Sequence, residues 1–210
     1  MSIKTIYKAL TAAGLTPQGA CGLMGNMMAE SSMKADIAQR GMTALTDRQY
    51  TAAADAGELD FAHDAVGYGL CQWTYRTRKA ELLAFARARG VSVGDEAMQV
   101  QFCLRELRED FPGVWRVLTG SKDLYECARI VCIQYERPAV NNVDARHAYA
   151  QSFFRQLPGA AEPQPFPPDL SVLVMQAVLR GNGYEVEADG RKSAAFFEKL
   201  REFTADMEAC

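Results

Sequence analysis

The rest of the chain is organised around the stretch TPQGACGLMGNMMAESSM, residues Thr16–Met33. Thr16 followed by Pro17 is typical of a helix start, because threonine can cap the first turn and proline there loses no needed N–H. Apolar residues then recur at spacings of three, four and seven, so one broad face must be buried. These residues are Ala20, Cys21, Leu23, Met24, Met27 and Met28. The stretch therefore predicts a buried helix with Glu30 at its far end.

Glu30 is the candidate for chemistry in this stretch. A carboxyl group against a methionine-rich wall loses hydration in its ionised form, so we expect it to keep a proton near neutral pH. A general acid needs that property. Most acidic side chains are simply solvated, so the hypothesis depends on the pattern around Glu30.

A second informative stretch is DFAHDAVGYGLCQWT, residues 60–74, which predicts a small β-hairpin. Its glycines, including Gly69, allow unusual backbone angles or a close approach to a ligand. The amide of Gln72 can both donate to and accept from sugar groups. The rings of Tyr68 and Trp73 either stack on a sugar or pack in the core.

The segments GNMMAESSM (residues 25–33) and GYGLCQWT (residues 67–74), in this order and spacing, resemble the catalytic pieces of lysozyme-like glycosidases. The closest match is the phage tail lysozyme family, and the resemblance covers residues 3–157. It implies a mainly α, lysozyme-like helical domain in which a small β-hairpin lines the sugar cleft. Glu30 would be the catalytic glutamate, and the glycine-rich stretch with Gln72 would form the cleft floor.

The same resemblance implies substrate-binding roles for Tyr135 and Glu136, which end a later apolar helix. A surface ion pair between Glu136 and Arg137 is the alternative. Pro138 forces the chain out of the helix at this point and leaves polar side chains at its end.

Glycosidases usually use two carboxyl groups. Asp64 is the favoured partner of Glu30, because it lies just before the glycine-rich stretch, while Asp60 and Asp36 remain open. A separation of about 5 Å implies retention and about 6.5–9.5 Å implies inversion, which the sequence leaves undecided. Some lysozyme-like enzymes use the substrate's acetamido group instead, and lytic transglycosylases release an anhydro sugar.

The function that the resemblance implies is hydrolysis of the β-1,4 bond between N-acetylmuramic acid and N-acetylglucosamine in bacterial peptidoglycan. The chain would be a phage endolysin or a tail lysozyme, with peptidoglycan strands and possible phage tail proteins as partners. The N-terminus lacks the pattern of a secretory signal, so we expect synthesis in the host cytoplasm and action on the cell wall.

Two readings from other classes compete. The segment GLCQW around Cys71 resembles the nucleophile motif of CHAP-type amidases, with His147 or His63 as the base. In that fold the cysteine begins a helix and the histidine lies on a strand, whereas the patterns here predict the reverse. The other reading is a non-catalytic wall-binding tail protein in which Glu30 is inert.

The composition limits other partners. The chain has 210 residues, is 49% hydrophobic and has a net charge of −3, so no basic field favours nucleic acid. No apolar run approaches the length needed to span a membrane. The two histidines and six cysteines form no metal-ligand spacing, so we expect neither metal nor cofactor.

The domain organisation follows from one proline-rich segment. Residues 158–168 hold five prolines and predict a linker between a catalytic domain (residues 1–157) and a small helical unit (residues 169–210). That unit resembles a shortened peptidoglycan-binding module. Helices are predicted at residues 2–13, 16–30, 47–56, 75–89, 123–136 and 144–156, with further helices beginning near residues 95 and 112.

Overall fold

A computed structural model describes residues 3–157, 170–187 and 194–208. The chain divides into two compact units, residues 1–160 and 161–210. Helices make up almost all regular structure in the described ranges, as the mainly α prediction requires. The predicted linker at residues 158–168 lies outside the described residues.

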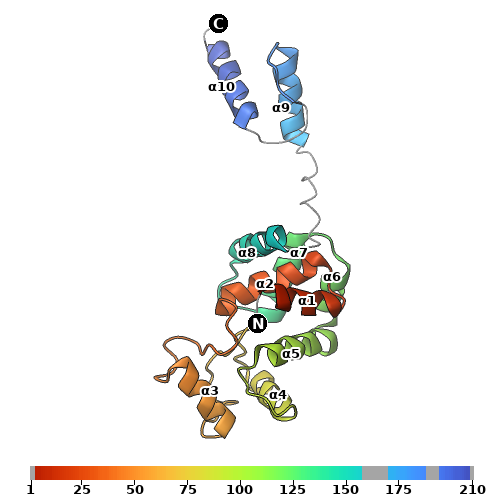
Figure 1. The fold of residues 1–210 in the computed structure, drawn as a ribbon. Coiled ribbons are helices and arrows are strands. Elements are labelled where there is room, and N and C mark those ends of the chain that lie inside the picture. The colour runs from red at the N-terminus through yellow and green to blue at the C-terminus, as the bar shows by residue number, and fades with distance from the viewer. Residues whose placement is uncertain (1–2, 158–169, 188–193, 209–210) are drawn as a thin grey trace. The chain divides into compact units, whose positions relative to one another are not determined.

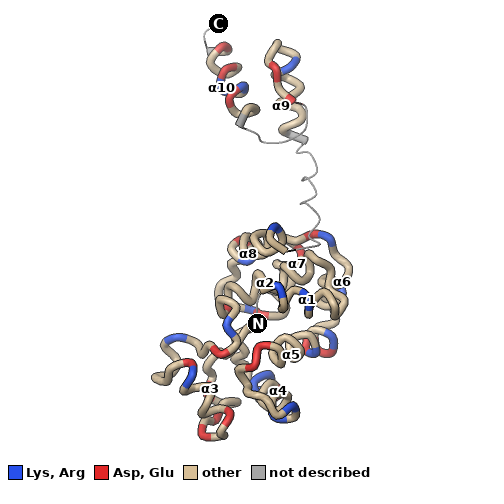
Figure 2. The backbone as a smooth tube through the Cα atoms, viewed as in Figure 1, with Lys and Arg blue, Asp and Glu red and all other residues tan. Residues whose placement is uncertain are grey.

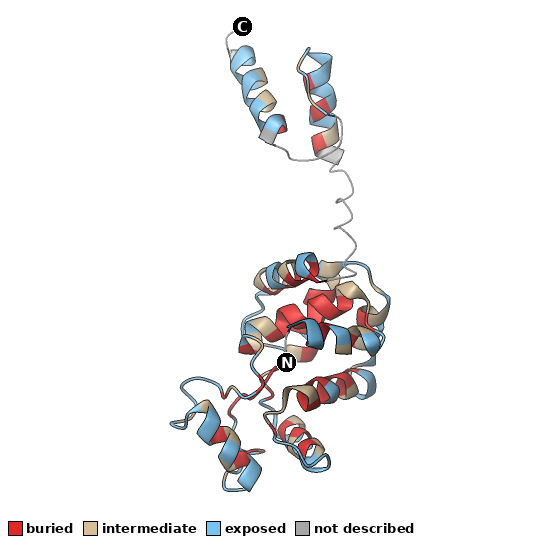
Figure 3. Cartoon of the chain, viewed as in Figure 1, coloured by how far each residue is buried: buried red, intermediate tan, exposed pale blue. Residues whose placement is uncertain are grey.

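Helix α2 (Pro17–Ser31) forms the centre of the first unit (Figure 1). Its predicted start is confirmed, because the Thr16 hydroxyl accepts a hydrogen bond from the N–H of Gly19 at 2.9 Å. Figure 3 shows that most of the helix is buried. Four α-helices and one π-helical segment pack against it. The α-helices are α1 (Ile3–Ala12), α6 (Pro112–Gly120), α7 (Leu124–Ile130) and α8 (Val143–Gln156).

A row of glycines lets α2 lie close to its neighbours. A Cβ at Gly19 would lie 2.0 Å from the Leu118 carbonyl oxygen of α6, and one at Gly22 would lie 2.7 Å from Cys127 of α7. A Cβ at Gly25 would lie 2.4 Å from the carbonyl oxygen of a residue on α8. Because these contacts involve backbone, no larger residue fits without moving a helix.

Gly25→Ala is therefore expected to push α8 away from α2 and to lower the free energy of unfolding by about 1–3 kcal/mol. Gly120→Ala is the matched control, since a Cβ at Gly120, also in a helix, meets nothing within 4 Å. We expect the control to stay within about 0.5 kcal/mol of the wild type. Urea unfolding of both variants measures the difference, and equal stabilities would contradict this account of the packing.

The first unit holds three more helices: α3 (Asp47–Ala56), α4 (Arg76–Arg87) and α5 (Glu96–Glu109). Helix α5 packs against α1 and α6, and α4 packs against α5. The bounds of α3 agree with the prediction, and Thr46 caps its N-terminus in a capping box. The predicted hairpin is not confirmed as a pair of strands. The described residues of this region hold only isolated bridges, from Tyr68 to Ala38 and to Trp73.

The helix predicted at residues 123–136 is not uniform. It begins as α7 and continues as a π-helix, η1 (Val131–Glu136). The N–H of Arg137 closes this segment on the carbonyl oxygen of Cys132 at 2.9 Å, and Arg137 itself is left-handed, with φ of 51°. A π-helical segment within an α-helix changes which side chains face inward, and such segments are frequent at functional sites.

The second unit holds α9 (Leu170–Gly181) and α10 (Ala194–Glu208), which pack through Val172, Leu179 and Phe196. Its resemblance to a peptidoglycan-binding module stays a prediction. In the described ranges, no helix combines the length and apolar character required to cross a bilayer. Acidic and basic residues are mixed on α5 and α8 (Figure 2), in keeping with the small net charge.

Candidate active site

Glu30 lies in the last turn of α2, and its side chain is 17% exposed. The next residue fixes this helix end, because the Ser31 hydroxyl donates to the Met27 carbonyl at 2.9 Å and to the Leu70 carbonyl at 3.0 Å. Ser32 then adopts a left-handed conformation with φ of 54° and ends the helix. Glu30 therefore lies where the buried helix meets the glycine-rich stretch.

Arg146 of α8 holds the Glu30 carboxyl group. One guanidinium nitrogen, Nη2, donates to Oε1 of Glu30 at 2.6 Å, and the other, Nη1, donates to Oδ1 of Asn26 at 3.1 Å. Asn26 and Glu30 are four residues apart on α2 and so share a face. The Asn26 amide is itself fixed by donating to the carbonyl oxygens of Gly22 and Ala128. The ion pair with Arg146 therefore fixes the position of the Glu30 carboxyl group.

The glycine-rich stretch is a tight turn that is fixed by hydrogen bonds to the side chain of Gln99. The side chain of Gln99 accepts from the N–H of Leu70 at 2.9 Å and donates to the carbonyl oxygens of Ala35 and Val93. Gly69 has φ of 74°, and a Cβ there would lie 2.5 Å from Gln99, so only glycine fits. Gln72 is partly exposed, and its amide nitrogen donates to the Gly69 carbonyl at 3.1 Å.

The aromatic residues predicted to bind sugar lie in the core. Tyr68 and Trp73 are fully buried, and Tyr135 is almost so. Tyr68 packs edge-on against Phe61 and donates to or accepts from Thr51 at 2.6 Å. No ring face of these three residues is open to solvent in this structure, so core packing accounts for their positions.

Trp73 and Tyr135 are linked through a buried carboxylate, Glu106 of α5, which is 1% exposed. Its Oε2 accepts from the Trp73 indole N–H and from the Tyr135 hydroxyl, both at 2.7 Å. Arg78 of α4 donates to both carboxylate oxygens, at 2.7 and 2.9 Å. Through Glu106, this network connects Trp73 of the glycine-rich turn to Tyr135 of η1 and so stabilises the structure around the candidate site.

Asp64, the predicted second carboxylate, has partners of its own. Lys79, which is completely buried, forms an ion pair with it, and the Tyr50 hydroxyl donates to it at 2.5 Å. The backbone N–H of Val66 also donates to it at 3.0 Å. No hydrogen bond or ion pair joins Asp64 to Glu30, both of which lie within the described residues.

Glu136, predicted to bind substrate, is the last residue of η1 and is partly exposed. Burial, together with the negative charge of Glu30, raises the pKa of Glu136 well above its ordinary value. Its Oε1 is buried and has no hydrogen-bond partner in the described part of the chain. The segment η1, which ends in Glu136, packs against α2, which carries Glu30 in its last turn.

Cys71, the nucleophile of the amidase reading, is a buried thiol 3.9 Å from the sulfur of Cys103. Burial raises its pKa well above the ordinary value, which works against a reactive thiolate. The described contacts of the two histidines lie elsewhere: His63 pairs with Asp60, and His147 packs on Tyr125. This geometry does not form a Cys–His pair.

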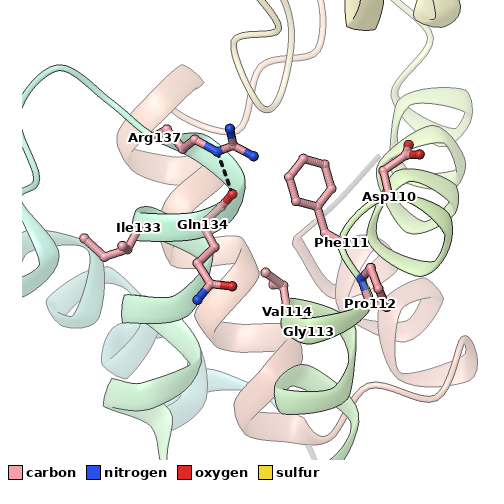
Figure 4. Close-up of a pocket in the computed structure, with 8 residues that line it drawn as sticks. All are labelled: Asp110, Phe111, Pro112, Gly113, Val114, Ile133, Gln134 and Arg137. Carbon is pink, nitrogen blue, oxygen red and sulfur yellow. Dashed lines mark hydrogen bonds between the residues drawn. The ribbon is translucent and has the colours of Figure 1, made fainter.

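A hollow of about 380 Å³ adjoins the end of η1. It is lined by residues 110–114, which include the start of α6, and by Ile133, Gln134 and Arg137 (Figure 4). The Nε of Arg137 donates to the Gln134 carbonyl at 2.9 Å, and its guanidinium lies 5.5 Å from the centre of the Phe111 ring. The hollow therefore presents the guanidinium of Arg137 and the ring of Phe111 beside the end of η1. Within the described ranges, no cluster of three or more His, Cys, Asp and Glu side chains is suited to a metal ion.

Sequence reasoning missed the groups that position the candidate carboxyls, above all Arg146 and Arg78. Asn26 left a signal, because it is the one amide in the otherwise apolar and glycine-rich residues 19–29 of α2. Arg146 left none, because it lies 116 residues from Glu30 in a helix of ordinary amphipathic pattern.

Comparison with known proteins gives the family of this chain. Morphogenesis protein 1 of Bacillus phage B103 is 28% identical over 153 residues, which is 70% of this chain and 36% of that protein. The chain thus spans little more than a third of that relative. A family model described as phage tail lysozyme matches residues 2–157, the part that contains both Glu30 and the glycine-rich turn. The chain belongs to the phage tail lysozyme family.

Proposed function

We propose that this protein is a phage-type lysozyme that hydrolyses the β-1,4 bond between N-acetylmuramic acid and N-acetylglucosamine in peptidoglycan, with Glu30 as the general acid. The observation that carries the proposal is the position of Glu30. It ends the most buried helix of the unit, is partly exposed, and lies beside the turn that contains Gly69 and Leu70. Family membership supports a cell-wall glycan as the substrate class.

The proposed step follows from this geometry. As the bond from the anomeric carbon to the glycosidic oxygen breaks, the electron pair stays on that oxygen, which takes a proton from Glu30. Water then adds to the anomeric carbon and loses a proton to a carboxylate. Arg146, bonded to Glu30 at 2.6 Å, keeps the carboxyl group in one orientation during both transfers.

The substrate contacts are proposed from exposed groups. The amide of Gln72 is partly exposed at the glycine-rich turn and can bond to an acetamido group or a sugar hydroxyl. The hollow beside Arg137 offers room for a further part of the substrate along η1. We propose that the protein acts on the wall either after release from the host cytoplasm or as part of a phage tail.

Mass spectrometry of purified peptidoglycan digested by the protein tests this function. A hydrolase produces glycan fragments with reducing muramic acid ends. Anhydro ends would instead show a lytic transglycosylase, and cleavage at the lactyl amide would show an amidase. Intact glycan after prolonged digestion would show a non-catalytic tail protein and contradict the proposal.

A further inference from the structure

The chain around the glycine-rich turn has two faces. The isolated bridges of this region align three buried side chains in one row: Ala38, Tyr68 and Trp73. Successive residues of an extended chain point to opposite faces, so the next row, which holds Gln39, Gly67 and Thr74, faces the other way. The side chains of Gln39 and Thr74 are exposed. The turn therefore has a buried aromatic face and an exposed polar face.

Three polar side chains converge on the position where Gly67 lacks a Cβ. A Cβ there would lie 3.0 Å from Oε1 of Gln72, and 3.1 Å from both Oε1 of Gln39 and Oγ1 of Thr74. The φ angle of Gly67 is outside the left-handed region, so its backbone conformation does not require glycine. The missing side chain instead lets the three polar groups come together. We call Gln39, Gln72 and Thr74 the polar platform.

Hydrogen bonds to the backbone hold each side chain of the polar platform in place. The Oε1 of Gln39 accepts from the N–H of Gly67 at 3.1 Å. The Nε2 of Gln72 donates to the carbonyl oxygen of Gly69, also at 3.1 Å. The Thr74 hydroxyl donates to the carbonyl oxygen of Gln72 at 2.8 Å. The polar platform is therefore ordered before any ligand binds, which lowers the entropic cost of binding.

Each glutamine of the polar platform keeps one half of its amide free. In the described part of the chain, neither Nε2 of Gln39 nor Oε1 of Gln72 has a hydrogen-bond partner. The first is a donor and the second an acceptor. An acetamido group carries the complementary pair, a carbonyl oxygen and an N–H. The polar platform therefore matches an N-acetyl group, which a plain glucose unit lacks.

The polar platform lies on the turn that contacts the end of α2. The hydroxyl of Ser31, the residue after Glu30, donates to the carbonyl oxygen of Leu70 in this turn at 3.0 Å. We propose that the polar platform is a subsite that recognises the N-acetyl group of one sugar of the substrate, which makes Gln39 a specificity-determining residue. Gln39 donates to the acetamido carbonyl, and the acetamido N–H donates to Gln72. The inference rests on the proposed function for the identity of the glycan.

Binding of two matched tetrasaccharides tests the subsite without cleavage. The β-1,4-linked tetramer of N-acetylglucosamine carries acetamido groups, and the glucose tetramer of the same linkage carries hydroxyl groups in their place. Calorimetry is done in the Glu30→Gln background, which keeps the ligands intact. We expect the acetylated tetramer to bind about tenfold more tightly than the glucose tetramer. Equal affinities would overturn the subsite.

Gln39→Glu, added to this background, isolates the amide donor. The new carboxylate still accepts from the N–H of Gly67 but cannot donate to an acetamido carbonyl. We expect about tenfold weaker binding of the acetylated tetramer and an unchanged affinity for the glucose tetramer. Gln101→Ala, which removes an exposed glutamine of α5, is the control and should change neither affinity. Unchanged binding of the acetylated tetramer by Gln39→Glu would remove Gln39 from the subsite.

Gly67→Ala tests the convergence of the three side chains. Its methyl group would meet only the ends of side chains, so we expect the fold to persist by circular dichroism. The displaced amides should bind the acetylated tetramer about tenfold more weakly. Wild-type affinity in Gly67→Ala would show that recognition does not depend on the polar platform.

Peptidoglycan cleavage separates this inference from the proposed function. With Glu30 in place, Gln39→Glu is expected to raise KM about tenfold and to leave kcat within about threefold, because the lost contact is made in substrate and transition state alike. Wild-type kinetics in Gln39→Glu beside an inactive Glu30→Gln would overturn the subsite and leave the proposed function standing. A protein that prefers the acetylated tetramer but leaves peptidoglycan intact would support the subsite and contradict the proposed function.

Discussion

Glu30→Gln is expected to lower the rate of peptidoglycan cleavage by about 10²–10⁴-fold while leaving the fold intact. The amide keeps the shape of the carboxyl group, and its oxygen can still accept the hydrogen bond from Arg146 that the structure places at 2.6 Å. What it lacks is the transferable proton. Release of soluble glycan fragments measures the rate, and thermal unfolding followed by circular dichroism measures the fold.

Glu109→Gln is the matched control for this variant. Glu109 also ends a helix, but it is 66% exposed and lies 3.7 Å from Arg105, on a different helix from Glu30. We expect the control to cleave peptidoglycan at the wild-type rate. Comparable rates for Glu30→Gln and Glu109→Gln would remove Glu30 from the chemistry.

Glu106→Gln is expected to lower the free energy of unfolding by about 3–5 kcal/mol, the largest effect on stability that we foresee. Glu106 accepts four hydrogen bonds, two of them from Arg78, and is almost completely buried. An amide offers one acceptor oxygen instead of two and turns its own donors toward Trp73 or Arg78. The guanidinium of Arg78, which is 15% exposed, would then lack its counter-charge.

A double substitution separates the lost pair from lost packing. The combination Arg78→Met with Glu106→Leu removes both charges, so it should destabilise the protein less than Glu106→Gln alone. Urea unfolding of the single and double variants gives both free energies. A cost below about 1 kcal/mol for Glu106→Gln would contradict the view that this network supports the site.

Local patterns predicted the helical scaffold well. Thr16 and Pro17 define the start of α2, and Thr46 defines the start of α3, because a cap depends on residues within one turn of each other. The glycines of α2 were visible in the sequence. Their role in helix packing was not visible, because the helices that contact these glycines lie more than ninety residues further along the chain.

The candidate site was predicted only in part, for the same physical reason. The position of Glu30 at the end of a buried helix follows from periodicity within α2. Its partner Arg146 depends on how α2 and α8 pack together, and the π-helical form of the segment that ends at Glu136 has no signature in the local pattern. Trp73 shows most clearly what the sequence leaves open, because an aromatic residue beside glycines can either stack on a sugar or pack in the core. The hydrogen bond from its indole N–H to Glu106 identifies it as a core residue.

The most direct test of the account is a crystal structure of Glu30→Gln with a bound peptidoglycan fragment that spans the cleavable bond. The account predicts that the glycosidic oxygen lies about 3 Å from the residue 30 carboxamide. A fragment bound with its glycosidic oxygen far from residue 30 would contradict it.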